Sequence, residues 1–168
     1  MAVGNLEFIK SASGTSVSSI EITNCFSDKY DVYLLDLPKM DSNGASYINL
    51  RFLKASDGLP DTTASYDSAG LIMRTNAAFG ESRYTGQTQF VNSFGSVDGG
   101  SYNNGGTFII YNPFSSSSYS FLSAQMASYW AGDLGWKSIG VHKVAQSNSG
   151  IQIIVNSDYI QASIFGVK

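Results

Sequence analysis

The side chains in this sequence that could carry catalysis or bind a metal are few. His142 is the only histidine and Cys25 the only cysteine, which excludes multi-histidine sites, cysteine metal clusters and an internal disulfide. Serine occurs 27 times, but no Gly-x-Ser-x-Gly elbow marks one of them as a nucleophile. We therefore expect no catalytic triad, no metal site and no cofactor.

The single histidine and the single cysteine both fit structural roles. His142 falls on the same face of an expected strand as Ser138 and Gly140, so we interpret it as a surface or hydrogen-bonded histidine rather than a general base. Cys25 follows Ile22 and precedes Phe26, an apolar setting typical of a small buried hydrophobe rather than a reactive thiol.

The carboxylates and glycines match no binding motif in full. Thirteen acidic residues could supply the opposed pair of a glycoside hydrolase, but many of them stand in turns, where Asp is common for backbone reasons. The glycine-rich run 99–106 lacks the lysine of a phosphate-binding loop. Asp41 to Gly44 begins like a calcium loop, yet Phe52 occupies the closing acidic position. A glycan-degrading enzyme remains an alternative that requires two facing carboxylates.

Aromatic and arginine side chains supply six candidate contact residues. Tyr129, Trp130 and Trp136 bracket a short turn, and aromatic rings beside polar groups are typical of sugar-binding surfaces. Burial of at least two of the three rings in the core is the interpretation that we favour. A second cluster contains types that are enriched at protein interfaces. Its members are Arg74, Arg83 and Tyr84.

Charge and hydropathy exclude several partners. With a net charge of −3 and scattered Lys and Arg, the chain lacks the basic surface that nucleic acids or anionic membranes require. No apolar run approaches the roughly 18 residues of a membrane span. The start of the chain shows no secretory signal, so we expect synthesis in a cytosol.

Ser and Gly are abundant while strong helix formers are scarce, which disfavours helices. Short alternating segments bounded by turn residues predict an all-β fold: an antiparallel two-sheet β-sandwich or jelly roll of about ten short strands, in a single domain over 1–168. We expect residues 94–106 to form an exposed loop and 136–144 to form a hairpin with 150–156. A short helix over 123–130 is the competing interpretation. The expected strands are 6–11, 17–26, 30–37, 47–54, 65–75, 83–92, 107–111, 119–130, 136–144, 150–156 and 159–167.

Three stretches resemble a known family. They are Met1 to Lys10, the run Gly106-Thr-Phe-Ile-Ile-Tyr-Asn-Pro-Phe-Ser115 with its serine tail, and the ending from Gly150 through Val167. In order and spacing they resemble the β-sandwich virion structural proteins of tailed bacteriophages, those of marine phages especially. In that family a Phe-x-Ile-Tyr strand precedes Asn-Pro-Phe or Asn-Pro-Tyr and serines.

The resemblance implies a non-enzymatic structural protein of the virion, made in the host cytoplasm. It would decorate the capsid or belong to the tail apparatus, and its partners would be further copies of itself, as a homotrimer, and the major capsid or tail proteins. Residues 1–12 would be the attachment segment, and no catalytic residue is carried over. The alternative is a carbohydrate-binding or host-receptor-binding module that recognises a surface glycan through Tyr129, Trp130, Trp136 or the 94–106 loop.

Overall fold

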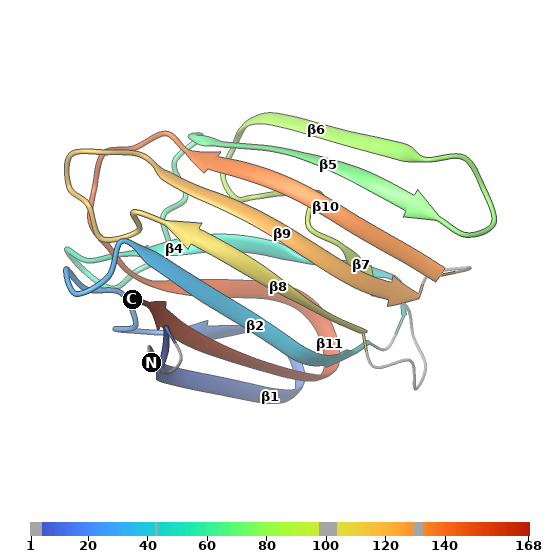
Figure 1. Ribbon diagram of the computed structural model, residues 1–168, viewed down its shortest axis with the longest axis horizontal. Coiled ribbons are helices and arrows are strands. Elements are labelled where there is room, and N and C mark those ends of the chain that lie inside the picture. The colour runs from blue at the N-terminus through green and yellow to red at the C-terminus, as the bar shows by residue number, and fades with distance from the viewer. Residues whose placement is uncertain (1–4, 43, 98–103, 130–132) are drawn as a thin grey trace.

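Strands account for all the regular secondary structure in the described residues of the computed structural model, which are 5–42, 44–97, 104–129 and 133–168 (Figure 1). The antiparallel all-β class predicted from the sequence is confirmed. No helix within these ranges is long and apolar enough to cross a membrane. The strands are β1 (Leu6–Ile22), β2 (Val32–Asp41), β3 (Ser46–Tyr47), β4 (Asn49–Lys54), β5 (Tyr66–Arg74), β6 (Gly80–Gln87), β7 (Ser96–Val97), β8 (Asn104–Tyr111), β9 (Ser120–Tyr129), β10 (Asp133–His142) and β11 (Asn148–Val167).

One large sheet doubles back on itself to make two layers. Its nine strands run in the order β1-β11-β2-β8-β9-β10-β5-β6, with β4 also paired to β11, and β3 and β7 form a separate two-stranded sheet. The first half of β11 pairs with β4 and its second half with β2, while β1 follows most of its length. Figure 1 shows the bend that carries β11 from the rear layer to the front one. The arrangement is consistent with a β-sandwich whose layers are continuous through β11.

The two longest strands each join segments that the sequence pattern separates. The expected strands 150–156 and 159–167 leave a break at Ser157 and Asp158, but the chain stays extended there because neighbouring strands satisfy its polar groups. The Ser157 hydroxyl donates to the Asp41 carbonyl at 2.6 Å, and the Asn156 N–H donates to Ser46 Oγ at 3.1 Å. The hairpin expected between 136–144 and 150–156 is wrong, since β10 pairs with β9 and β5 whereas β11 pairs with β1, β2 and β4.

The strand expected over 30–37 stops short of Pro38, yet β2 continues past Pro38 to Asp41. Proline has no N–H to give to a neighbouring strand, and the pairing of β2 with β8 shifts register between Leu37 and Met40, on either side of Pro38. The irregularity accommodates the proline without ending the strand.

Residues 120–129 form strand β9, not the competing helix, and their burial alternates with a period of two. Leu122 and Met126 are buried, whereas Phe121 and Gln125 on the opposite row are exposed. The same alternation in the other strands encloses one core between the layers. Its largest fully buried side chains are Tyr33, Tyr66, Phe52, Phe90, Phe94 and Phe108.

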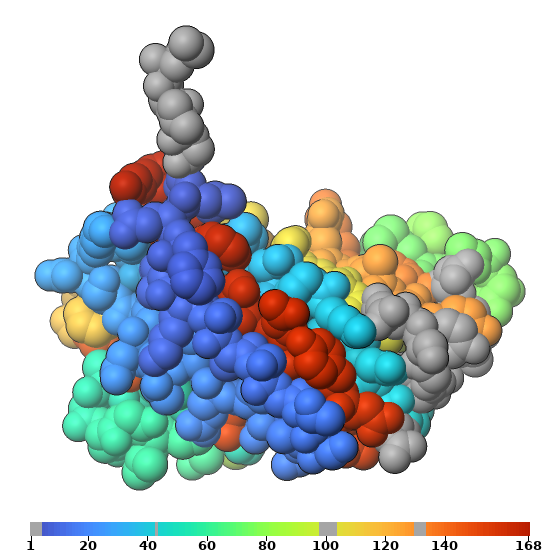
Figure 2. All heavy atoms as spheres, turned by 90° about the horizontal axis from the view of Figure 1, so that it is seen from below, coloured from blue at the N-terminus to red at the C-terminus, as the bar shows by residue number. Residues whose placement is uncertain are grey.

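The stretch expected to serve as an attachment segment is largely part of the sheet. Leu6 lies opposite Val167 and Ala12 opposite Ala162, so residues 6–12 belong to the edge strand β1. Figure 2 shows β1 in blue beside the red second half of β11 across this side of the molecule. Residues 1–4 lie outside the described residues, and the attachment role stays a prediction.

Candidate interaction surface

The outward face of β8, β9, β10 and β5 carries exposed apolar side chains. Ile139 of β10 is 64% exposed and Phe121 of β9 is 47% exposed, and Leu71 of β5 and Ile109 of β8 are 42% and 38% exposed. These strands are hydrogen-bonded neighbours, so the four side chains stand on one continuous surface. We call these four residues the outer patch.

At Gly70, Ser138 and Gly140 the inward rows of β5 and β10 carry small residues because another segment packs directly against them. A Cβ atom on Gly70 would lie 2.6 Å from the carbonyl oxygen of Ser93, and one on Gly140 would lie 2.6 Å from the ring of Phe90. The Ser138 hydroxyl donates to the Ser93 carbonyl. Residues 90–97 thus occupy the inner side, which leaves the apolar row of β10 on the outside.

This packing corrects the expectation of an exposed loop at 94–106. Phe94, Ser96 and Val97 are buried, and β8 already begins at Asn104, which is itself buried. Residues 98–103 lie outside the described residues. Gly95, Gly105 and Gly106 of this stretch stand where a Cβ atom would crowd a neighbouring segment, so these glycines serve close packing.

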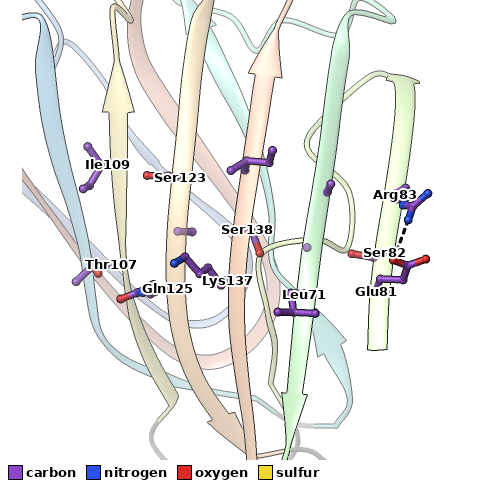
Figure 3. A pocket seen from close by; sticks show the side chains of 14 residues that line it. Leu71, Glu81, Ser82, Arg83, Thr107, Ile109, Ser123, Gln125, Lys137 and Ser138 are labelled. Carbon is purple, nitrogen blue, oxygen red and sulfur yellow. Dashed lines mark hydrogen bonds and ion pairs between the residues drawn. The ribbon is translucent and has the colours of Figure 1, made fainter. Parts of the chain in front are cut away.

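Two adjoining hollows, of about 520 and 550 Å³, lie over the outer patch and share Ala69, Arg83, Ser123 and Ile139. Figure 3 shows the first of them, crossed by Lys137 and Gln125 and flanked by the ion pair between Arg83 and Glu81 at 2.9 Å. Charges of both signs therefore border an apolar floor. The surface is broad and shallow, a form suited to another macromolecule.

The structure divides the six candidate contact residues among different places. Arg83 and Tyr84 line the outer hollows. Tyr129 is half-buried at the end of β9, and its N–H donates to Asn104 Oδ1 at 2.7 Å. Trp130 lies outside the described residues. Trp136 is only 3% exposed and belongs to the core, in agreement with core packing and not with an exposed aromatic platform at this ring.

Arg74 and Trp136, which the sequence placed in separate clusters, line one cavity of about 350 Å³. It is bordered by the C-terminal end of β5, the N-terminal end of β10 and the small β3–β7 sheet. Its lining residues are Tyr47, Ile72, Arg74, Asn76, Ala77, Ser96, Leu134 and Trp136.

His142 is fully buried and pairs with a carboxylate that sequence reasoning did not single out. Its Nε2 lies 2.9 Å from Asp61 Oδ2, and Gln146 Nε2 donates to the same oxygen at 2.7 Å. The His142 ring stacks on Tyr66, with 4.4 Å between ring centroids. The prediction of a hydrogen-bonded histidine is confirmed, and its complete burial excludes a surface position.

In the buried pair of His142 and Asp61, both side chains have a pKa below the usual value. Burial lowers the pKa of His142 more than the neighbouring Asp61 raises it, so the ring is neutral near pH 7. Burial works to raise the pKa of Asp61, but hydrogen bonds from Thr63 and the proximity of His142 outweigh it and leave that pKa below its usual value. The imidazole therefore donates from Nε2 to a carboxylate.

The histidine–aspartate pair does not extend to a serine. His142 Nδ1 is buried without a hydrogen-bond partner in the described part of the chain. Ser120, which faces His142 across the β9–β10 ladder, instead donates its hydroxyl to the Asn112 carbonyl at 3.3 Å. We interpret the pair as a fastening between β10 and the loop that precedes β5. Nor do three His, Cys, Asp or Glu side chains gather into a metal-binding group anywhere in the described ranges.

Comparison with family models, with curated proteins and with solved structures found no match for this chain.

Proposed function

We propose that this chain is a non-enzymatic structural protein that associates with other copies of itself through the outer patch. By its resemblance to the virion proteins of tailed bacteriophages, it would serve in the particle as a capsid-surface decoration or as part of the tail apparatus. The observation that carries the proposal is the outer patch on a regular sheet face.

The exposed apolar side chains of the outer patch favour burial by a partner. Removing apolar area from water contributes roughly 25 cal/mol per Å², and contiguous exposed patches commonly mark protein contacts. The outer patch combines four large apolar side chains, and among the polar side chains that stand between them only Lys137 is charged. Two molecules can therefore gain stability by covering it without desolvating many charges.

A further copy of the chain is the partner that the bordering charges suit best. Glu81 and Arg83 pair on β6, Asp67 pairs with Lys143, and Lys137 makes no ion pair among the described residues. Positive and negative groups stand around the same apolar floor, so two copies can place opposite charges together. A strongly acidic or basic partner gains no such advantage. A homotrimer is the stoichiometry that the resemblance implies.

The experiment measures assembly at two levels. Light scattering coupled to size exclusion, at micromolar concentrations, should give a mass that is a small multiple of the 18.0 kDa chain. Peptides of this chain should also co-purify with phage particles through a density gradient. A strictly monomeric protein that is absent from purified particles would contradict the proposal.

A further inference from the structure

Two residues that line the cavity with Arg74 carry polar side-chain atoms that no described residue satisfies. Trp136 Nε1 and Ser96 Oγ are both buried and have no hydrogen-bond partner among the described residues. Each belongs to a residue that lines the cavity and is less than a tenth exposed. A buried donor without a partner is unfavourable, so a ligand that reaches these groups would gain their hydrogen bonds.

The cavity also presents a cation that pairs with no acidic side chain in the described ranges. Arg74 is exposed at the end of β5 and makes no ion pair in the described part of the chain. Among the side chains that the structure describes, no acidic one lines the cavity. Guanidinium and indole N–H groups only donate hydrogen bonds, so the lining favours a ligand that is rich in acceptors and negatively charged.

The remaining lining is apolar and aromatic. Ile72 and Leu134 are buried beside the Trp136 ring, and Tyr47 meets that ring edge-on at 6.5 Å between centroids. A volume of about 350 Å³ accommodates a small cyclic molecule. The wall therefore suits a ring with one apolar side, and the donors suit its hydroxyl or carboxylate oxygens.

We propose that this cavity is a binding site for a carboxylate-bearing sugar, such as a uronic or sialic acid. Arg74 binds the carboxylate, and ring or hydroxyl oxygens accept hydrogen bonds from Trp136 Nε1 and Ser96 Oγ. Trp136 and Leu134 pack against the apolar side of the sugar. The site is separate from the outer patch, because Trp136 belongs to the inward row of β10 and Ile139 to the outward row.

The buried indole gives a direct readout. In the full chain carrying Trp130→Phe, the Trp136 indole N–H gives the only tryptophan side-chain signal in a ¹⁵N-correlated spectrum. Titration with glucuronic acid and with N-acetylneuraminic acid should shift this signal saturably, with dissociation constants in roughly the millimolar range. Glucose tests the need for the charge, and acetate tests the need for the ring.

Two variants that each remove one positive charge make a matched pair. Arg74→Gln removes the charge at the cavity, whereas Lys39→Gln removes an exposed charge from β2, outside both the cavity and the outer hollows. We expect Arg74→Gln to weaken acidic-sugar binding by about tenfold or more, and Lys39→Gln to change it by less than about twofold. Glucose and acetate should each bind at least about tenfold more weakly than the acidic sugars.

Three results would overturn this assignment. One is the absence of a saturable shift with either acidic sugar up to about 50 mM. Another is acidic-sugar binding that Arg74→Gln leaves intact. The third is binding of acetate or glucose as tight as that of the acidic sugars. Circular dichroism of both variants, compared with the parent, confirms that an altered response is not caused by unfolding.

Discussion

His142 Nε2 lies 2.9 Å from Asp61 Oδ2, and neither residue is more than 1% exposed. The two are far apart in the sequence, so the contact fastens the loop before β5 to the end of β10. Thr63 N–H donates to the other carboxylate oxygen at 2.9 Å. Both oxygens of the Asp61 carboxylate therefore take part in hydrogen bonds. Because His142 is titratable, the pair also makes the stability of the fold depend on pH.

We predict that the free energy of unfolding falls as pH falls below about 6.5. The pKa of His142 is lower in the folded protein than in the unfolded chain. Between the two pKa values the unfolded state binds a proton that the folded state does not, so acid favours unfolding. The contribution of the neutral His142 ring to stability is fully present above the pKa of His142 in the unfolded chain. It is lost as pH falls from that value through the pKa of His142 in the folded protein, by at most about 1.4 kcal/mol per pH unit. Urea unfolding between pH 5 and 8 measures this slope.

The variant His142→Gln supplies the control for this slope. It removes the titrating ring, so its stability should be lower overall and nearly independent of pH over the same interval, where the carboxylates remain ionised. A wild-type protein whose stability is flat from pH 8 to 5, or a variant with an unchanged slope, would show that His142 does not carry the dependence.

Gly140 should be intolerant of a side chain. A Cβ atom there would lie 2.6 and 2.9 Å from two ring atoms of Phe90, and both Phe90 and Phe94 are buried with little room to move. Gly140→Ala should destabilise the fold by roughly 1–3 kcal/mol in thermal or urea unfolding. Gly80→Ala, where the nearest atoms lie at an ordinary 3.5 Å, should change stability by less than about 0.5 kcal/mol. Equal effects of the two substitutions would contradict the close packing of β10.

The thiol of Cys25 should be unreactive in the native protein. It is 3% exposed, its sulfur donates to the Ile22 carbonyl at 3.2 Å, and burial raises its pKa to about 12. Very little thiolate therefore forms at pH 8. A thiol reagent such as Ellman's should react with one equivalent only after denaturant is added. Rapid reaction without denaturant would place Cys25 at the surface.

The alternation of residue types was enough to predict the fold class. In β9 the sequence places Leu122 and Met126 on one row and Phe121 and Gln125 on the other, and burial follows those rows. Continuity of strands was harder to predict, because Ser157 carries a turn-forming side chain whose hydroxyl is satisfied by a distant strand. Such long-range partners are not visible in local sequence.

The sequence predicts which residues of a strand share a row with Ile139, but it does not predict that this row faces outward. Ile139 shares its row with Lys137, and His142 shares the other row with Ser138, so hydrophobicity alone favours burying Ile139. The opposite occurs because the segment through Phe90 covers the small residues of β10. Which row faces inward depends on this non-local packing. The cavity at Arg74 and Trp136 is similarly formed by segments that are distant in the sequence.

Self-association through the outer patch can be tested by replacing Phe121 and Ile139 together. The double variant Phe121→Thr/Ile139→Thr keeps residues that suit strands while removing most of the exposed apolar area of β9 and β10. Leu59→Thr is the matched control, because Leu59 is 60% exposed but lies in the loop between β4 and β5.

Sedimentation velocity of the three proteins over a range of micromolar concentrations tests the central claim most directly. We predict that the wild type and Leu59→Thr sediment as the same oligomer, and that the double variant dissociates at concentrations at least about tenfold higher than the wild type does. A wild type that sediments as a monomer throughout, or a double variant that assembles as tightly as the wild type, would contradict the account.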